Sequence, residues 1–136
     1  MLAQESVLFA NETFYQALAD GNYTVMDALW SREAPVTCIH PGQHPLCDRE
    51  QIMATWQQIF ANGSSPTVCC HAPEAFVSRD TGFVVCYELV ADTMLIATNI
   101  FRREDRRWRM VHHQAGPTIT AASQLAIPGH LSHTVH

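Results

Sequence analysis

Apolar residues recur at helical spacing in the first part of the chain. Within residues 4–20 they fall on one stripe of a helix, and Gly21 follows as a residue that ends helices. Asn22 is placed to cap a second helix, whose apolar positions include Trp30 and which Pro35 stops. The spacing therefore predicts two amphipathic helices in this part of the chain.

A short strand and a third helix follow. VTCIHP, at residues 36–41, has the β-branched and apolar content of a strand. Asp48 can cap the next helix, and Gln51 three positions later completes a variant of the capping box. Trp56 lies on the apolar face of this helix, which we expect to end at Asn62–Gly63.

From residue 67 to residue 116 the pattern changes to extended stretches. Asp80–Thr81–Gly82 and Glu104–Asp105 are typical of turns between them. The connections are too short for parallel crossovers, so the sheet must be largely antiparallel. Pro73 requires an edge strand or a bulge, because proline donates no ladder hydrogen bond. The predicted strands are TVCCHAPEAFVS, GFVVCYELVAD, MLIATNIFRR and RWRMVHHQAG.

Both faces of the two middle strands are apolar, since odd and even positions in 83–90 and 94–101 are mostly hydrophobic. An antiparallel sheet normally leaves one face polar, and helices that all precede the long strands can cover only one side. We predict that a second copy covers the other side, in an isologous homodimer through the outer sheet face. The alternative is that the tail after Pro117 folds back over it.

Composition and charge narrow the function classes. The chain of 136 residues is of single-domain length, with 8 Lys+Arg against 13 Asp+Glu and a net charge of -5. This balance provides no basic field for nucleic acid or an anionic membrane. The arginines of 102–109 are interrupted by Glu104 and Asp105, which favours a solvated hairpin tip over an anion site. With no basic leader and no long apolar run, we expect a soluble cytoplasmic protein.

No metal or cofactor is predicted. The five cysteines lack CxxC spacing and are typical of reduced, buried thiols. His40 and His44 are four residues apart, but the prolines and glycine around them forbid the helix that would align them. The tail histidines His130, His133 and His136 are expected to bind nickel or zinc only adventitiously. Phosphate-binding loops, GxSxG elbows and HExxH motifs are all missing from the sequence.

A family resemblance rests on VTCIHPG, the helix containing Trp56, ATNIFRR and WRMVHHQAGP, in that order. Over residues 5–117 the chain resembles the nuclear-transport-factor-2-like superfamily, in particular its SnoaL-like branch and the association (hub) domain of calcium/calmodulin-dependent protein kinase II. The resemblance implies an α+β, cone-shaped (cystatin-like) roll, in which N-terminal helices pack on a strongly curved, mainly antiparallel sheet. It also implies a pocket at the open end and dimers through the outer sheet face. We therefore expect one domain at 1–117 and a tail at 118–136, loosely ordered or packed on the partner.

Polar residues within apolar strands are the candidates for the pocket, because burying them unpaired is costly. They are Glu88, Asn99, His112 and His113. Strand alternation puts His113 on one side with Ala115, opposite Trp108, Met110 and His112. Hub domains carry pocket arginines at positions that match Asn99 and Ala115. This match implies that His113, on the same side as Ala115, faces the pocket. Because this chain has neither arginine, the departure argues against carboxylate binding. His112 matches the hub's own histidine, so a one-residue bulge would reverse this assignment.

Three functions remain open. The first is a homodimer that binds a small, largely apolar molecule between aromatic walls, for which the candidates are Tyr15, Trp30, Trp56 and Phe101. The second is a cofactor-independent isomerase, dehydratase or cyclase, with His113 as general acid or base, Asn99 as oxyanion donor and Glu88 orienting the histidine. The third is a hub-type oligomerisation module. The same polar residues are equally consistent with hydrogen-bonded core positions, and the ligand is not identified.

Overall fold

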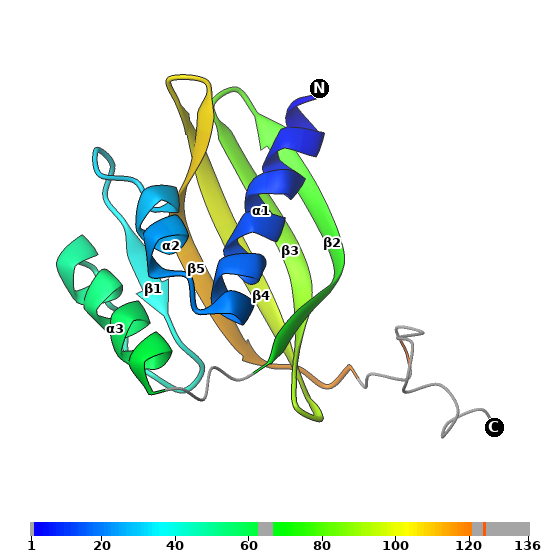
Figure 1. The fold of residues 1–136 in the computed structure, drawn as a ribbon. Coiled ribbons are helices and arrows are strands. Elements are labelled where there is room, and N and C mark those ends of the chain that lie inside the picture. Colours follow the sequence, from blue (N-terminus) through cyan, green and yellow to red (C-terminus); the bar gives the residue numbers. More distant parts are fainter. Residues whose placement is uncertain (1, 63–66, 121–123, 125–136) are drawn as a thin grey trace.

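Three helices pack on one side of a curved five-stranded sheet (Figure 1). The structure is a computed structural model that describes residues 2–62, 67–120 and 124. The strand order is β1-β5-β4-β3-β2, with β1 parallel to β5 and the other pairs antiparallel. This confirms the α+β class and the mainly antiparallel sheet. The elements are α1 (Ala3–Asp20), α2 (Tyr23–Leu29), β1 (Thr37–Ile39), α3 (Arg49–Ala61), β2 (Val68–Ser78), β3 (Thr81–Val90), β4 (Thr93–Glu104) and β5 (Arg107–Pro117).

The helix boundaries follow local capping. Gly21 ends α1 in the left-handed region, at φ 63°, and Asn22 accepts a hydrogen bond from the Val25 amide at the start of α2. The prediction that this second helix runs towards Pro35 is wrong. Trp30 leaves the helix to form a bridge with Met110 of β5, because burying its indole in the core outweighs another helical turn.

Strand β2 is an edge strand with a bulge, as Pro73 predicts. The register with β3 shifts between His71 and Glu74, and Ala72 takes a positive φ of 53°. The bulge bends β2 over α1, which lies along the concave side of the sheet (Figure 1).

Gly82 lies within β3, as in the predicted strand GFVVCYELVAD, and Thr81 belongs to β3 too, so of the predicted turn Asp80–Thr81–Gly82 only Asp80 is a turn residue. A Cβ atom at Gly82 would come within 2.6 Å of Val7 Cγ2, so glycine is what lets α1 approach the sheet closely. The β2–β3 reversal is made at Arg79 and Asp80, and Arg79 takes a positive φ of 55°.

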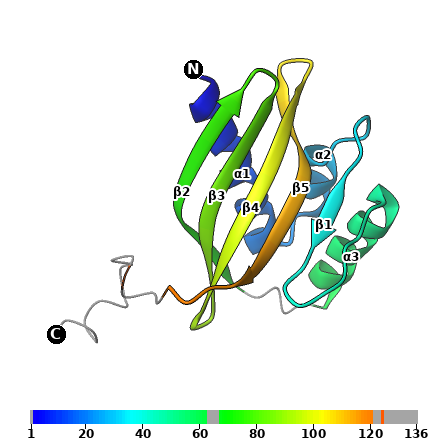
Figure 2. The same cartoon turned by 180° about the vertical axis from the view of Figure 1, so that it is seen from behind.

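No helix of the described residues lies on the outer side of the sheet (Figure 2). Phe76 and Phe83 stack there with ring centroids 5.0 Å apart and are 43% and 39% exposed. Within the described ranges, no helix is long and apolar enough to cross a bilayer. The structure describes only residues 118–120 and 124 of the predicted tail. The rest of the tail, including its three histidines, lies outside the described residues.

Candidate functional site

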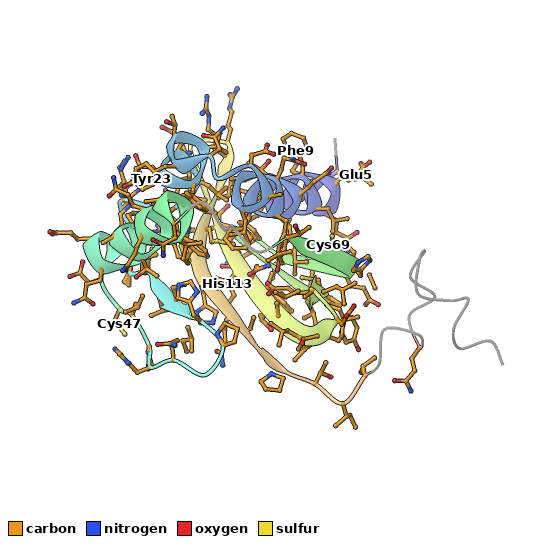
Figure 3. All side chains as sticks on the ribbon, turned by 60° about the horizontal axis from the view of Figure 1, so that its bottom comes forward. Glu5, Phe9, Tyr23, Cys47, Cys69 and His113 are labelled. Carbon is orange, nitrogen blue, oxygen red and sulfur yellow. The ribbon has the colours of Figure 1, made fainter. Side chains whose placement is uncertain are left out.

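A pocket of about 390 Å³ opens between α3, the end of β1 and the concave side of the sheet. Its walls are mostly apolar, and four polar residues line it: His113 from β5, Glu88 from β3, Thr93 at the start of β4 and His40 from the loop after β1. Figure 3 looks towards this end of the molecule and shows His113 in the interior between the strands and the helices. The apolar wall residues are Leu18, Pro41, Trp56, Ile59, Val68, Val90 and Leu95.

A bulge in β5 determines which histidine faces the pocket. Met110 pairs with Phe101 and His112 pairs with Ile100, so Val111 has no partner in β4. His113 is 3% exposed on the inner side, whereas His112 lies outside, where its Nδ1 is 2.6 Å from Thr37 Oγ1. His113 lies on the side of Ala115 and opposite His112, as predicted, whereas the prediction that it lies opposite Trp108 and Met110 is wrong, because Met110 and His113 share the core side. The bulge precedes both histidines, so it reverses the sides of Trp108 and Met110 relative to them and leaves His113 on the inner side.

Hydrogen bonds fix the orientation of the His113 ring. Asn99 donates through Nδ2 to Asn11 Oδ1 at 2.8 Å and to the Tyr15 hydroxyl at 3.1 Å. Its Oδ1 lies 2.6 Å from His113 Nδ1 and can only accept, so that ring nitrogen is the donor. His113 Nε2 then carries the lone pair and lies 3.9 Å from Glu88 Oε2.

Burial sets the charge of each group in the site. It lowers the pKa of His113 to about 3, assisted by His40 and His112, so the imidazole is neutral at ordinary pH. Burial raises the pKa of Glu88, against the effect of a 2.6 Å hydrogen bond from the Tyr15 hydroxyl. The pKa of Tyr15 is also raised well above its usual value, by burial and by the Glu88 carboxylate, so Tyr15 keeps its proton.

Several predicted site residues lie elsewhere. Asn99 is fully buried behind His113 and both of its N–H groups are used, so it cannot donate to an oxyanion in the pocket. Trp30 and Phe101 belong to the core away from the pocket. Tyr15 is hidden behind Glu88, which it orients. Strand alternation predicts only which side of the sheet a side chain takes. At these positions the inner side is filled by neighbouring helices and strands, so the side chains do not line the pocket.

Sequence reasoning missed His40 as a pocket residue. Its ring packs edge-on against Trp56 with centroids 4.9 Å apart, and 6.4 Å from the ring of His113. The available signal was its position directly after a short strand that would join the sheet beside β5. In the described ranges, no cluster of three or more His, Cys, Asp or Glu side chains could hold a metal ion.

Comparison with known proteins gives consistent results. The family model of the SnoaL-like domain matches residues 7–120. A candidate dehydratase of the NTF2-like family from Streptomyces avermitilis is 27% identical, with a TM-score of 0.78 over 86% of this chain and 96% of that one. A candidate calcium/calmodulin-dependent protein kinase type II association domain from Thiobacillus denitrificans is 31% identical, with a TM-score of 0.69 over 80% of this chain and 92% of that one.

A curated relative is longer than this chain. The F-box protein SKIP8 of Arabidopsis thaliana is 23% identical over 124 residues, which are 90% of this chain and 54% of that protein. The chain therefore spans about half the length of this relative.

Proposed function

The chain belongs to the SnoaL-like domain family, and from this we propose that its cone pocket binds a small, largely apolar molecule carrying one hydroxyl or enolisable carbonyl group. The observation that carries the proposal is the pairing of a neutral His113 with Glu88 at 3.9 Å on a mostly apolar wall. Apolar walls supply affinity, whereas a few convergent polar groups orient the ligand.

The hydrogen-bonding capacity of the site selects the ligand. His113 Nε2 and Glu88 both accept, so a ligand hydroxyl aimed at them would donate. Trp56 lines the pocket, and its buried indole N–H has no partner among the described residues. A molecule with one hydroxyl donor on a largely hydrocarbon frame matches this polarity.

A fluorescent phenol tests the binding proposal directly. We expect 2-naphthol to bind once per chain, and 2-methoxynaphthalene, which lacks the donor, to bind at least about fivefold more weakly. Glu88→Gln should reduce this discrimination, whereas Glu12→Gln, an exposed glutamate on α1, should not. Failure of 2-naphthol to bind saturably, or equal affinity for both compounds, would refute the proposal.

A second candidate function is proton transfer next to a carbonyl, as in an isomerase or dehydratase that needs no cofactor. The pKa directions favour Glu88 as the base and not His113. Burial moves the pKa of the Glu88 carboxyl up, towards neutral pH, whereas it moves the pKa of the His113 imidazole down, away from neutral pH. The test is deuterium exchange at the carbon beside the carbonyl of 2-tetralone, followed by NMR. We expect Glu88→Gln to abolish the protein-catalysed exchange and Glu12→Gln to retain it.

The outer sheet face supports a homodimer as part of the same proposal. The stacked pair Phe76 and Phe83 is partly exposed, and an apolar patch of this kind is typical of an interface. We expect light scattering to give a dimer at micromolar concentration and Phe83→Glu to give a monomer. Phe9→Glu, which changes a 64% exposed phenylalanine on α1, should leave the dimer intact. A monomeric unmutated chain would contradict the dimer, and rings larger than a dimer would favour the hub-type module.

A further inference from the structure

A groove on the helix side of the molecule lies between α1, α2 and the hairpin that joins β4 to β5. It has a volume of about 370 Å³, and we call it the hairpin groove. Figure 1 shows the hairpin at the end of the sheet where α1 begins and α2 ends. No described residue lines both this groove and the pocket that contains His113, so the function proposed for the pocket does not use it.

The inner surface of the hairpin groove is apolar. Phe9 of α1 lines it, is 64% exposed and projects outward from the helix in Figure 3. Leu29 of α2 and Trp108 of β5 also line it and are buried. A large aromatic side chain that stays exposed beside buried apolar residues offers a partner an apolar surface to cover.

Arginine side chains supply the charge of the hairpin groove. Arg106, Arg107 and Arg109 line it, and no Asp or Glu of the described residues does. Arg109 donates through Nη1 to the Ala28 carbonyl near the end of α2, so its side chain is held beside the groove before any partner binds. Arg106 and Arg107 are exposed. The groove therefore combines an apolar surface with three cations.

The carboxylates around the hairpin do not neutralise these three arginines. Glu104 lies 4.0 Å from Arg102, and Asp80 lies 3.3 Å from Arg103. Asp105 is exposed at the tip and does not line the groove. Within the described ranges, none of the three groove arginines forms an ion pair. Their charge is available to carboxylates of another molecule, which arginine can bind through two parallel hydrogen bonds.

We propose that the hairpin groove binds an acidic, amphipathic helix of another protein. Apolar side chains of that helix cover Phe9 and Trp108, and its carboxylates pair with the three groove arginines. Two walls of the groove are helices, whose backbone hydrogen bonds are internal, so a partner has to bind through its side chains. An amphipathic helix presents apolar and charged side chains next to one another at suitable spacing.

Shape and charge argue against two other anionic partners. The charge pattern of residues 102–109 alone favours a solvated tip, but the fold sets this tip beside a concave apolar surface. A flat bilayer does not reach into a concave surface, and a net charge of -5 repels an extended polyanion such as nucleic acid. A short acidic helix reaches the groove and meets mainly the local arginines.

Fluorescence polarisation with a labelled peptide tests the proposal in the full chain. The probe is a helical peptide with leucine along one face and with glutamate and alanine on the others. We expect saturable binding that weakens as the salt concentration rises, because salt screens the charge pairs. The same peptide with lysine in place of glutamate should bind at least about tenfold more weakly.

Matched variants locate the binding on the chain. Arg107→Glu should weaken it at least about fivefold. Arg79→Glu changes another exposed arginine that has no ion pair among the described residues, and it should have no effect. Phe9→Ala should also weaken binding, whereas Leu2→Ala, at a 71% exposed residue before α1, should not. All four side chains are exposed, so the variants should keep the fold, which urea unfolding checks.

Several outcomes would overturn the proposal. They are an acidic peptide that does not bind saturably, equal binding of the lysine peptide, and equal effects of Arg107→Glu and Arg79→Glu. Binding of the chain to phosphatidylglycerol vesicles but not to the peptide would assign the groove to a membrane surface instead. None of these measurements uses a ligand of the pocket, so their result is independent of the function proposed for it.

Discussion

Replacing His113 by glutamine tests the electrostatics of the pocket. Glutamine keeps an N–H group for Asn99 Oδ1 but does not titrate. In the unfolded chain the imidazole takes up a proton below about pH 6.5, whereas the buried imidazole stays neutral down to about pH 3. His113 therefore contributes stability above pH 6.5 that is lost as the pH falls, because only the unfolded state gains the proton.

The size of the effect follows from the pKa difference. Each pH unit between the two pKa values costs about 1.4 kcal/mol of unfolding free energy. Between pH 8 and pH 5 the contribution of His113 falls by about 2 kcal/mol, and this figure is the same for any folded pKa below about 4. His40, His112 and Glu88 also titrate differently in the two states, but they are present in both proteins and cancel in the comparison.

Urea unfolding followed by tryptophan fluorescence provides the measurement. We expect His113→Gln to be less stable than the unmutated chain at pH 8 and the gap to shrink by about 2 kcal/mol at pH 5. His44→Gln, a change at an exposed histidine, is the control and should follow the unmutated chain at both values. If His113→Gln and the unmutated chain lose the same unfolding free energy between pH 8 and pH 5, the neutral, buried state of His113 is refuted.

Two further predictions concern packing and anchoring. Gly82→Ala should destabilise the fold by about 1–3 kcal/mol in urea unfolding, because its Cβ would meet Val7. Gly116→Ala is the control and should cost less, because a Cβ there meets open space. Equal losses of stability in the two variants would contradict the close approach of α1. Arg49→Lys should cost about 2 kcal/mol of unfolding free energy, because the guanidinium donates to the carbonyls that end α2 and lysine lacks its planar fork. Arg79→Lys, at an exposed turn, is the control and should cost nothing measurable. An equal effect of both substitutions would exclude this anchoring role of Arg49.

The sequence alone determined the elements and much of their order. Gly21 and Asn22 mark a helix end and a helix start through local hydrogen bonds, which need no distant residue. Pro73 marks the bulge of β2 because it lacks a donor. Period-two alternation and short connections suffice for an antiparallel sheet, since both are properties of neighbouring residues.

The pocket could be predicted only in part. Glu88 and His113 are identifiable as polar residues within apolar strands, and both line the pocket. Asn99 carries the same signal but lies behind His113, because the sequence does not reveal which buried polar group satisfies another. Trp30 carries the aromatic signal of a pocket wall but serves the core.

Tertiary packing decided the rest. The extra residue Val111 in β5 appears because Trp108 and Met110 bury on the same side as His113, and no local pattern encodes where a strand gains a residue to satisfy that packing. His40 joins the site because β1 pairs with β5, a contact between segments far apart in the sequence. Periodicity specifies which face a side chain takes within a regular element, whereas the meeting of His40, Glu88 and His113 depends on how the elements are packed against one another.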